Sequence, residues 1–112
     1  MILIIREPAS AEQLTQMAEQ FGSNFIKLAV DVKREILVGG GELHADCEQA
    51  LLEDGSQQAD IWGADWHPET RAVTFESLIN IRPRQQNFSM EVQDQALCAR
   101  IEEIVRRLLE VD

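Results

Sequence analysis

Two stretches of the chain alternate apolar and polar residues in the manner of extended strands, and each is broken by a short polar turn. In FIKLAVDVKREILV every second position from Ile26 to Val32 is apolar, and in DIWGADW followed by AVTFESLINIRP the alternation resumes after the turn HPETR. Alternation of this kind gives a strand one buried face. Tight hairpins join only antiparallel neighbours. The sequence therefore predicts a sheet made mainly of antiparallel hairpins.

Residues 33–38 allow two interpretations. A hairpin with its turn near Arg34 makes the apolar run at 36–38 a second strand, whereas a continuous helix could run through the same residues. The β-branched content of the segment favours the strand.

Three segments carry signals of helices. Ser10 stands three residues before Gln13, as in a capping box, and Gly22 is a natural stop, so we expect a helix from about Ala11 to Phe21. A short helix is expected after the glycines at 39–41, and a long one after the capping residue Asp94. The apolar stripe of the long helix consists of Leu97, Ile101, Ile104, Val105 and Leu108.

Together these elements predict one small α+β domain over residues 1–112 with the order β-α-ββ-α-ββ-α. A chain of 112 residues with 45% hydrophobic and 27% charged residues suits a single globular core. The first strand is the apolar run after Met1, and Pro83 is expected to stop the last one. We expect the helices to cover one face of the sheet with Leu14, Met17, Phe21, Ile101, Val105 and Leu108.

The net charge of -10 limits the kinds of partner. Nucleic acids and anionic membranes are bound through Lys and Arg, so neither is an expected partner, and basic partners or cations are more plausible. The start MILIIREPAS lacks the basic lead and longer apolar core of a signal peptide, which predicts a cytoplasmic protein. Two cysteines without a CxxC motif are expected to be reduced thiols there.

The segment GGGELHADCE, residues 39–48, is the densest concentration of chemically active side chains. A phosphate loop needs a Gly-Lys-Ser/Thr ending, and here acidic residues follow the glycines. A dinucleotide fingerprint needs a third glycine where the chain has His44. Both of these functions are therefore excluded for the segment, and no cofactor is predicted.

Two hypotheses remain for this segment. Glu42, His44, Asp46 and Glu48 could bind a divalent metal or do acid–base work, since zinc sites take three or four such ligands. The alternative is a strand-to-helix junction in which Asp46 caps the short helix and its neighbour Cys47 is buried. The junction is the preferred interpretation.

A polar stripe interrupts the second hairpin. If Trp66 faces Val73 across the turn, one strand face carries tryptophans and the other carries polar residues. On the polar face Glu76 would then lie opposite Gly63. The candidate site residues on this stripe are Asp65, Glu76, Asn80 and Arg82, with Arg84 just past Pro83. The arginines could bind a carboxylate of a ligand or form an internal Glu–Arg network on the wet face of the sheet, which is the preferred interpretation.

The phrases GGGELHADCE, LLEDGS, DIWGADW, TFESLINIRP and NFSMEVQD, taken together, resemble a family of small bacterial proteins known only as a domain of unknown function. The resemblance covers nearly the whole chain. It implies a one-domain bacterial cytosolic protein, and it carries no activity, cofactor or catalytic residue.

The sequence alone favours a non-enzymatic binding or interaction domain with a protein or small-molecule partner. It contains neither a recognisable nucleophile–base pair nor a complete set of metal ligands. The competing hypothesis is a small metal-dependent or hydrolase-like enzyme that uses Glu42, His44 and Asp46 with Glu76 and Arg82, and the test is whether these segments meet in one pocket. Two tryptophans and an apolar terminal helix also suggest a homodimer.

Overall fold

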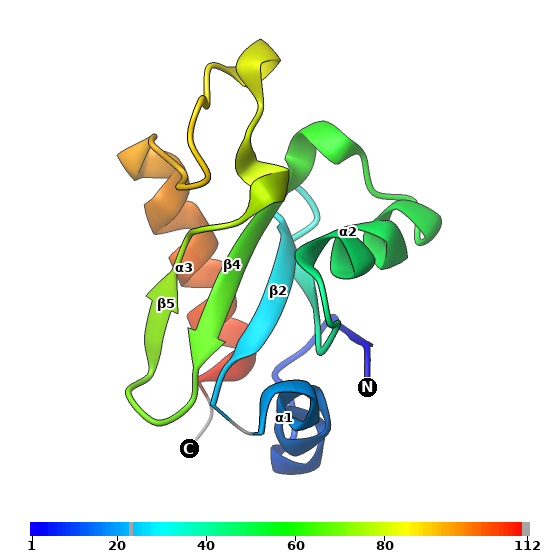
Figure 1. The fold of residues 1–112 in the computed structure, drawn as a ribbon. Coiled ribbons are helices and arrows are strands. Elements are labelled where there is room, and N and C mark those ends of the chain that lie inside the picture. Colours follow the sequence, from blue (N-terminus) through cyan, green and yellow to red (C-terminus); the bar gives the residue numbers. More distant parts are fainter. Residues whose placement is uncertain (23, 111–112) are drawn as a thin grey trace.

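A five-stranded antiparallel sheet forms the centre of the molecule, with the strand order β1-β3-β2-β4-β5 (Figure 1). This computed structural model describes residues 1–22 and 24–110. The strands are β1 (Leu3–Ile5), β2 (Ile26–Asp31), β3 (Ile36–Gly39), β4 (Ile61–His67) and β5 (Ala72–Thr74). The predicted α+β fold and its order of elements are confirmed. Residues 36–39 form a strand, so the helical alternative for this segment is wrong.

The three helices begin and end largely where their local signals indicate. α1 (Ala11–Ala18) starts with the capping box of Ser10 and Gln13, continues as one 3-10 turn to Phe21, and ends at Gly22, whose φ is 63°. α2 spans His44–Glu53. α3 (Gln95–Leu109) is capped by Asp94, which accepts hydrogen bonds from the N–H groups of the second and third helical residues. No helix among the described residues is long and apolar enough to cross a membrane.

The helices lie on both faces of the sheet, which corrects the expectation that they cover only one. α1 and α3 pack on the face that carries Trp62 and Trp66, where Met17, Ile101 and Leu108 are fully buried. α2 packs on the opposite face, in front of the sheet in Figure 1. The second core consists of Ala29, Ile36, Val38, Cys47, Leu51 and Ile61. The face expected to be wet is therefore largely buried.

The predicted long strand after the HPETR turn is wrong beyond its first residues. Trp66 does face Val73, as predicted, but β5 ends at Thr74 and the chain turns into a 3-10 helix at Leu78–Asn80. The carboxamide of Asn80 is fully buried and binds the backbone of Gly63, while Ser77 packs against the α-carbon of that glycine. On the side of β4 that faces away from β2, Asn80 rather than another strand therefore borders Gly63.

Residues 75–92 form a projecting loop that we call the clasped loop, drawn in yellow at the top of Figure 1. Its base is closed by Val92, whose N–H donates to the Phe75 carbonyl at 3.1 Å. The buried Asn87 amide donates to the carbonyls of three loop residues. A 3-10 turn at Pro83–Gln85 lies at the tip. The loop is thus held in a defined shape by buried amide side chains.

Candidate functional site

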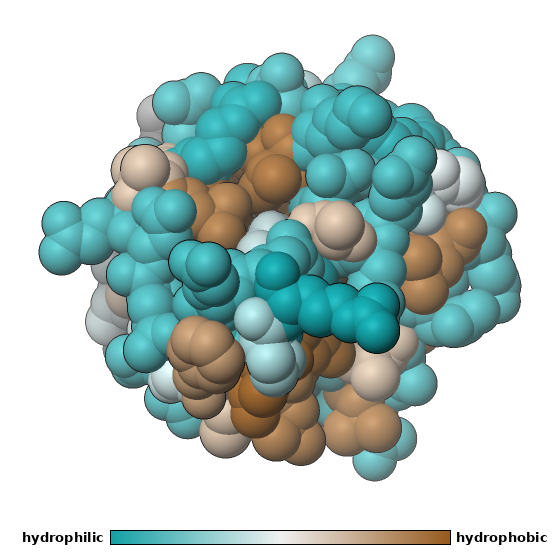
Figure 2. All heavy atoms as spheres, turned by 90° about the horizontal axis from the view of Figure 1, so that it is seen from above, coloured by the Kyte–Doolittle hydropathy of each residue, from teal (hydrophilic) through white to brown (hydrophobic). Residues whose placement is uncertain are grey.

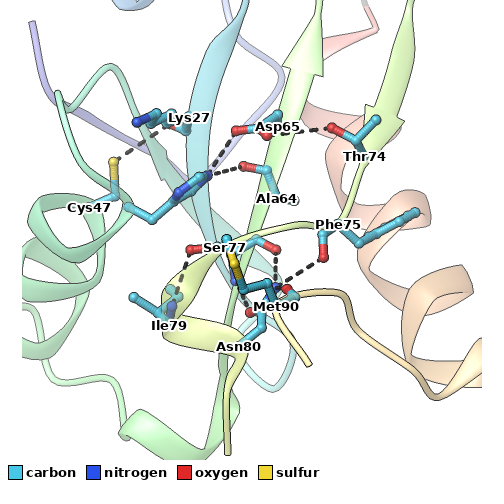
Figure 3. A network of polar contacts seen from close by, with 12 residues as sticks. Lys27, Cys47, Ala64, Asp65, Thr74, Phe75, Ser77, Ile79, Asn80 and Met90 are labelled. Carbon is cyan, nitrogen blue, oxygen red and sulfur yellow. Dashed lines mark hydrogen bonds and ion pairs between the residues drawn. The ribbon is translucent and has the colours of Figure 1, made fainter. Parts of the chain in front are cut away.

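The first residue of α2 and the middle of β4 are joined by a His–Asp pair. His44 Nε2 lies 2.8 Å from Asp65 Oδ1 and 3.1 Å from the Ala64 carbonyl oxygen. Both neighbours offer acceptor oxygens, an arrangement that suits the tautomer with the proton on Nε2. The other carboxylate oxygen of Asp65 accepts a 3.5 Å hydrogen bond from Thr74 (Figure 3). Two of the predicted site residues thus meet, although they are 21 positions apart in the chain.

The remainder of the GGGELHADCE segment forms a junction. α2 begins at His44, so Asp46 is its third residue and not the residue that precedes it, as the sequence suggested. Its carboxylate still acts at the helix start, accepting a 3.2 Å hydrogen bond from the Leu43 N–H. Cys47 is fully buried, as predicted, and burial raises the pKa of its thiol to about 11. An inert thiol of this kind packs the core.

Arg82 is fully engaged within the protein. Its guanidinium donates to the Ile61 carbonyl at 2.6 Å and to the Glu48 carboxylate at 3.2 Å, and it lies 5.0 Å from the Trp62 ring centroid. Burial lowers the pKa of Arg82, and the Glu48 charge acts in the opposite direction. Arg82 is therefore held by an internal ion pair with Glu48 of α2, and the expected network with Glu76 on a wet sheet face is wrong. Arg82 has no free donor group directed at a ligand.

The metal hypothesis finds no ligand set in the part of the chain that the structure describes. No group of three or more His, Cys, Asp or Glu side chains there is close enough to hold an ion. Glu42 is exposed, Asp46 is used at the start of α2, and His44 is paired with Asp65. A pair of residues falls short of the three or four ligands of a zinc site.

A hollow of about 290 Å³ lies beside the His–Asp pair. The segments around His44 and Glu76 meet here, as the enzyme hypothesis requires, but its other three residues do not line this hollow. Ser77 also lines it, yet only 2% of that residue is exposed and its hydroxyl accepts a hydrogen bond from the Ile79 N–H. The walls are mainly apolar, formed by Lys27, Leu43, His44, Ala45, Glu76, Ser77, Leu78, Ile79 and Met90.

A larger and more open hollow, about 730 Å³, adjoins the first. Leu78 and Ile79 line both hollows and thus form the wall between them. Arg82 and Arg84 line only the larger hollow. Of the candidate residues on the predicted polar stripe, Glu76 and Arg84 are exposed at these hollows, whereas Asn80 is completely buried.

Large apolar side chains are exposed around the two hollows, and we call four of them the apolar ridge. Their exposed fractions are 71% for Leu78, 55% for Leu43, 43% for Ile81 and 37% for Met90. Viewed from the end that carries the clasped loop, hydrophobic side chains gather most densely along the lower edge of the view, and smaller groups lie elsewhere among hydrophilic ones (Figure 2). The sequence carried no signal for this surface, because Leu78 was expected on a strand that does not continue beyond Thr74.

The fold and this surface define a small α+β domain with two adjoining surface hollows. The chain belongs to the family described as "Protein of unknown function (DUF5674)", whose model matches residues 3–108. Comparisons with curated proteins and with solved structures gave no match. The resemblance noted from the sequence is thereby confirmed.

Proposed function

We propose that this protein is a non-enzymatic binding module that contacts a protein partner through the apolar ridge. The observation that carries the proposal is the exposure of Leu43, Leu78, Ile81 and Met90 around two adjoining hollows. Exposed apolar side chains scattered singly are ordinary, but a group of them around a concave surface is typical of an interaction site. The chain also exposes Met1 and Ile2, which precede β1, and Phe88 in the clasped loop, and none of these three lines either hollow.

The construction of the clasped loop supports recognition by a preformed surface. Asn80 and Asn87 are buried and bind backbone groups of the loop on both sides of its tip. A loop fixed before binding loses little conformational freedom when a partner arrives, and this favours affinity. Binding residues are often presented in this way, by loops on a rigid scaffold.

The polar groups at the site also favour binding over catalysis. His44 Nε2 is occupied by Asp65 and Ala64, and Arg82 is bonded to backbone carbonyls and Glu48. The Ser77 hydroxyl is buried and contacts a backbone N–H. Hydrolysis by a serine would instead need a hydroxyl in hydrogen-bond contact with a base and open to substrate.

Panning a displayed library of random peptides on the immobilised protein tests this proposal. Leu78→Ser removes the most exposed ridge side chain, and Ile2→Ser, at a position that is 44% exposed on another part of the surface, is the matched control. We expect enriched peptides to bind the wild type and Ile2→Ser equally and to lose binding to Leu78→Ser. Circular dichroism melts verify that both variants are folded. The proposal would be contradicted if the enriched peptides still bound Leu78→Ser, or if panning enriched no peptide at all.

A further inference from the structure

Two glutamates face each other directly at the base of the clasped loop. Glu76 and Glu91 form an isolated antiparallel bridge, so their side chains start from neighbouring backbone positions. Both residues are exposed, and within the described residues neither carboxylate has a hydrogen bond or ion pair. Like charges placed directly opposite each other destabilise a strand pair. The protein therefore carries an unneutralised pair of negative charges here.

One of these glutamates, Glu76, lies in the wall of the smaller hollow. Glu91 does not line the hollow, but it is paired with Glu76 through the bridge and follows Met90, which is part of the wall. Lys27, whose ammonium lies 5.0 Å from the centre of the Phe21 ring, adds one positive charge at this hollow. The carboxylates of Asp65, Glu76 and Glu91 nearby add three negative charges. The uncompensated charge at this hollow is thus negative, in agreement with a net charge of -10 for the chain.

We infer that the partner segment carries a large apolar side chain next to lysine or arginine. The inference rests on the proposed function and specifies the chemistry of the partner. A hollow of about 290 Å³ with Leu43, Leu78 and Met90 in its walls accommodates one large apolar side chain. A basic group beside this anchor reaches Glu76 and Glu91, and arginine can bind carboxylates through two parallel hydrogen bonds.

A second copy of this chain suits the surface less well. In a two-fold symmetric dimer the same patch contacts itself. The glutamate pair of one copy would then approach the glutamate pair of the other, and the charges would repel. A basic partner instead gains from the charge of the whole molecule during its approach, an effect that salt weakens.

Fluorescence anisotropy with four synthetic peptides tests the inference. All four share a central Leu-Phe pair, and the flanking residues are lysine, arginine, serine or glutamate. We expect the lysine and arginine peptides to bind about tenfold more tightly than the serine peptide, and this advantage should shrink at high salt. The advantage of the basic peptides should disappear in the double variant Glu76→Gln/Glu91→Gln. It should persist in Glu12→Gln/Glu19→Gln, which removes the same charge from exposed positions on another element.

The outcomes separate the inference from the function on which it rests. Equal binding of all four peptides, lost in Leu78→Ser, overturns the basic partner but leaves the binding surface in place. An advantage of the basic peptides that persists in Glu76→Gln/Glu91→Gln also overturns the inference. So does the absence of binding by every peptide at about 1 mM, and the proposed function is then judged by the panning result. A Leu78-dependent dimer in light scattering would assign the surface to a second copy instead.

Discussion

The side chain of Asn80 makes both of the backbone hydrogen bonds that a neighbouring strand would make to Gly63. Its oxygen accepts from the Gly63 N–H at 2.8 Å, and its nitrogen donates to the Gly63 carbonyl at 3.0 Å. β5 pairs with β4 only along residues 65–67, so Gly63 lies beyond the end of that pairing. The same nitrogen also donates to the Phe75 and Met90 carbonyls, which ties the clasped loop to the sheet.

Asn80→Ala should therefore destabilise the protein strongly. The change leaves the buried N–H and carbonyl of Gly63 without a partner, and each such group costs about 1–3 kcal/mol. The Phe75 and Met90 carbonyls lose one of two donors, because they also accept from the N–H groups of Val92 and Ser77. We expect a total loss of about 3 kcal/mol or more in the free energy of unfolding. Denaturant unfolding measures this free energy. The control is Asn24→Ala, at an exposed position, which should cost below about 0.5 kcal/mol. Similar midpoints for the two variants would contradict this role for Asn80.

Gly63→Ala should be destabilising for a steric reason. A β-carbon at this position would lie 2.6 Å from the Ser77 β-carbon, well inside contact distance. Overpacking of this kind costs about 1–3 kcal/mol. Ser77→Gly removes the opposing atoms, so the double variant should be more stable than the sum of the two single changes predicts. A double-mutant cycle by thermal denaturation provides the measurement, and strict additivity would show that the clash is relieved elsewhere.

Stability should fall at alkaline pH because of Cys47. Burial raises the pKa of its thiol from 9.0 to about 11, so the folded state keeps the proton after the unfolded chain has released it. The stabilisation is complete below pH 9 and is lost as the pH rises toward 11, with a slope of about 1.4 kcal/mol per unit from this group. The chain has no tyrosine to titrate in the same range. Unfolding curves from pH 8 to 10.5 should slope less steeply in Cys47→Ala, and identical slopes would argue against the shift.

Asp46 should behave as a helix-start residue and not as a metal ligand. Asp46→Ala removes the acceptor for the Leu43 N–H and should cost about 1 kcal/mol, equally with and without a chelator. Asp46→Asn should cost less, because an amide oxygen also accepts this bond. Melting temperatures with chelator and with added zinc, manganese or magnesium supply the measurement. A metal-dependent rise of several degrees that is lost in Asp46→Asn would favour the metal hypothesis.

Two adjacent positions on α3 should differ sharply in their contribution to stability. Leu108 is fully buried between the helix and the sheet, so Leu108→Ala should cost about 2–5 kcal/mol. Arg107 is exposed and contacts Glu35 from the surface, so Arg107→Ala should cost less than about 1 kcal/mol. Urea midpoints in the opposite order would mean that the helix presents a different face to the core.

The order of elements could be predicted because its signals are local. The Ser10 capping box, the glycine stop at 22 and the Asp94 cap lie within a few residues of the structure they determine. Alternation from Ile26 to Asp31 likewise reflects a strand in the middle of the sheet. The strand predicted from the alternation after the HPETR turn ends early, at Thr74. Beyond it the chain is held by hydrogen bonds from the Asn80 side chain to Gly63 rather than by strand pairing.

The site could be predicted only in part for the same reason. His44, Asp65 and Glu76 were singled out by residue type, but their grouping depends on α2 crossing the face of β4. The sequence placed α2 on the other face, so Arg82 was expected to pair with Glu76 and the contact with Glu48 was missed. The apolar ridge was missed because Leu43 and Leu78 have ordinary identities and only their exposure is unusual.

Both outer strands of the sheet, β1 and β5, contain only three residues. An extended peptide that added itself to either edge would find few unpaired N–H and C=O groups, so backbone-directed growth of the sheet is poorly supported. The short edges thus protect the native protein against edge-to-edge aggregation. For the proposed binding function, the short edges favour a partner that is selected by its side chains rather than by its ability to become a strand.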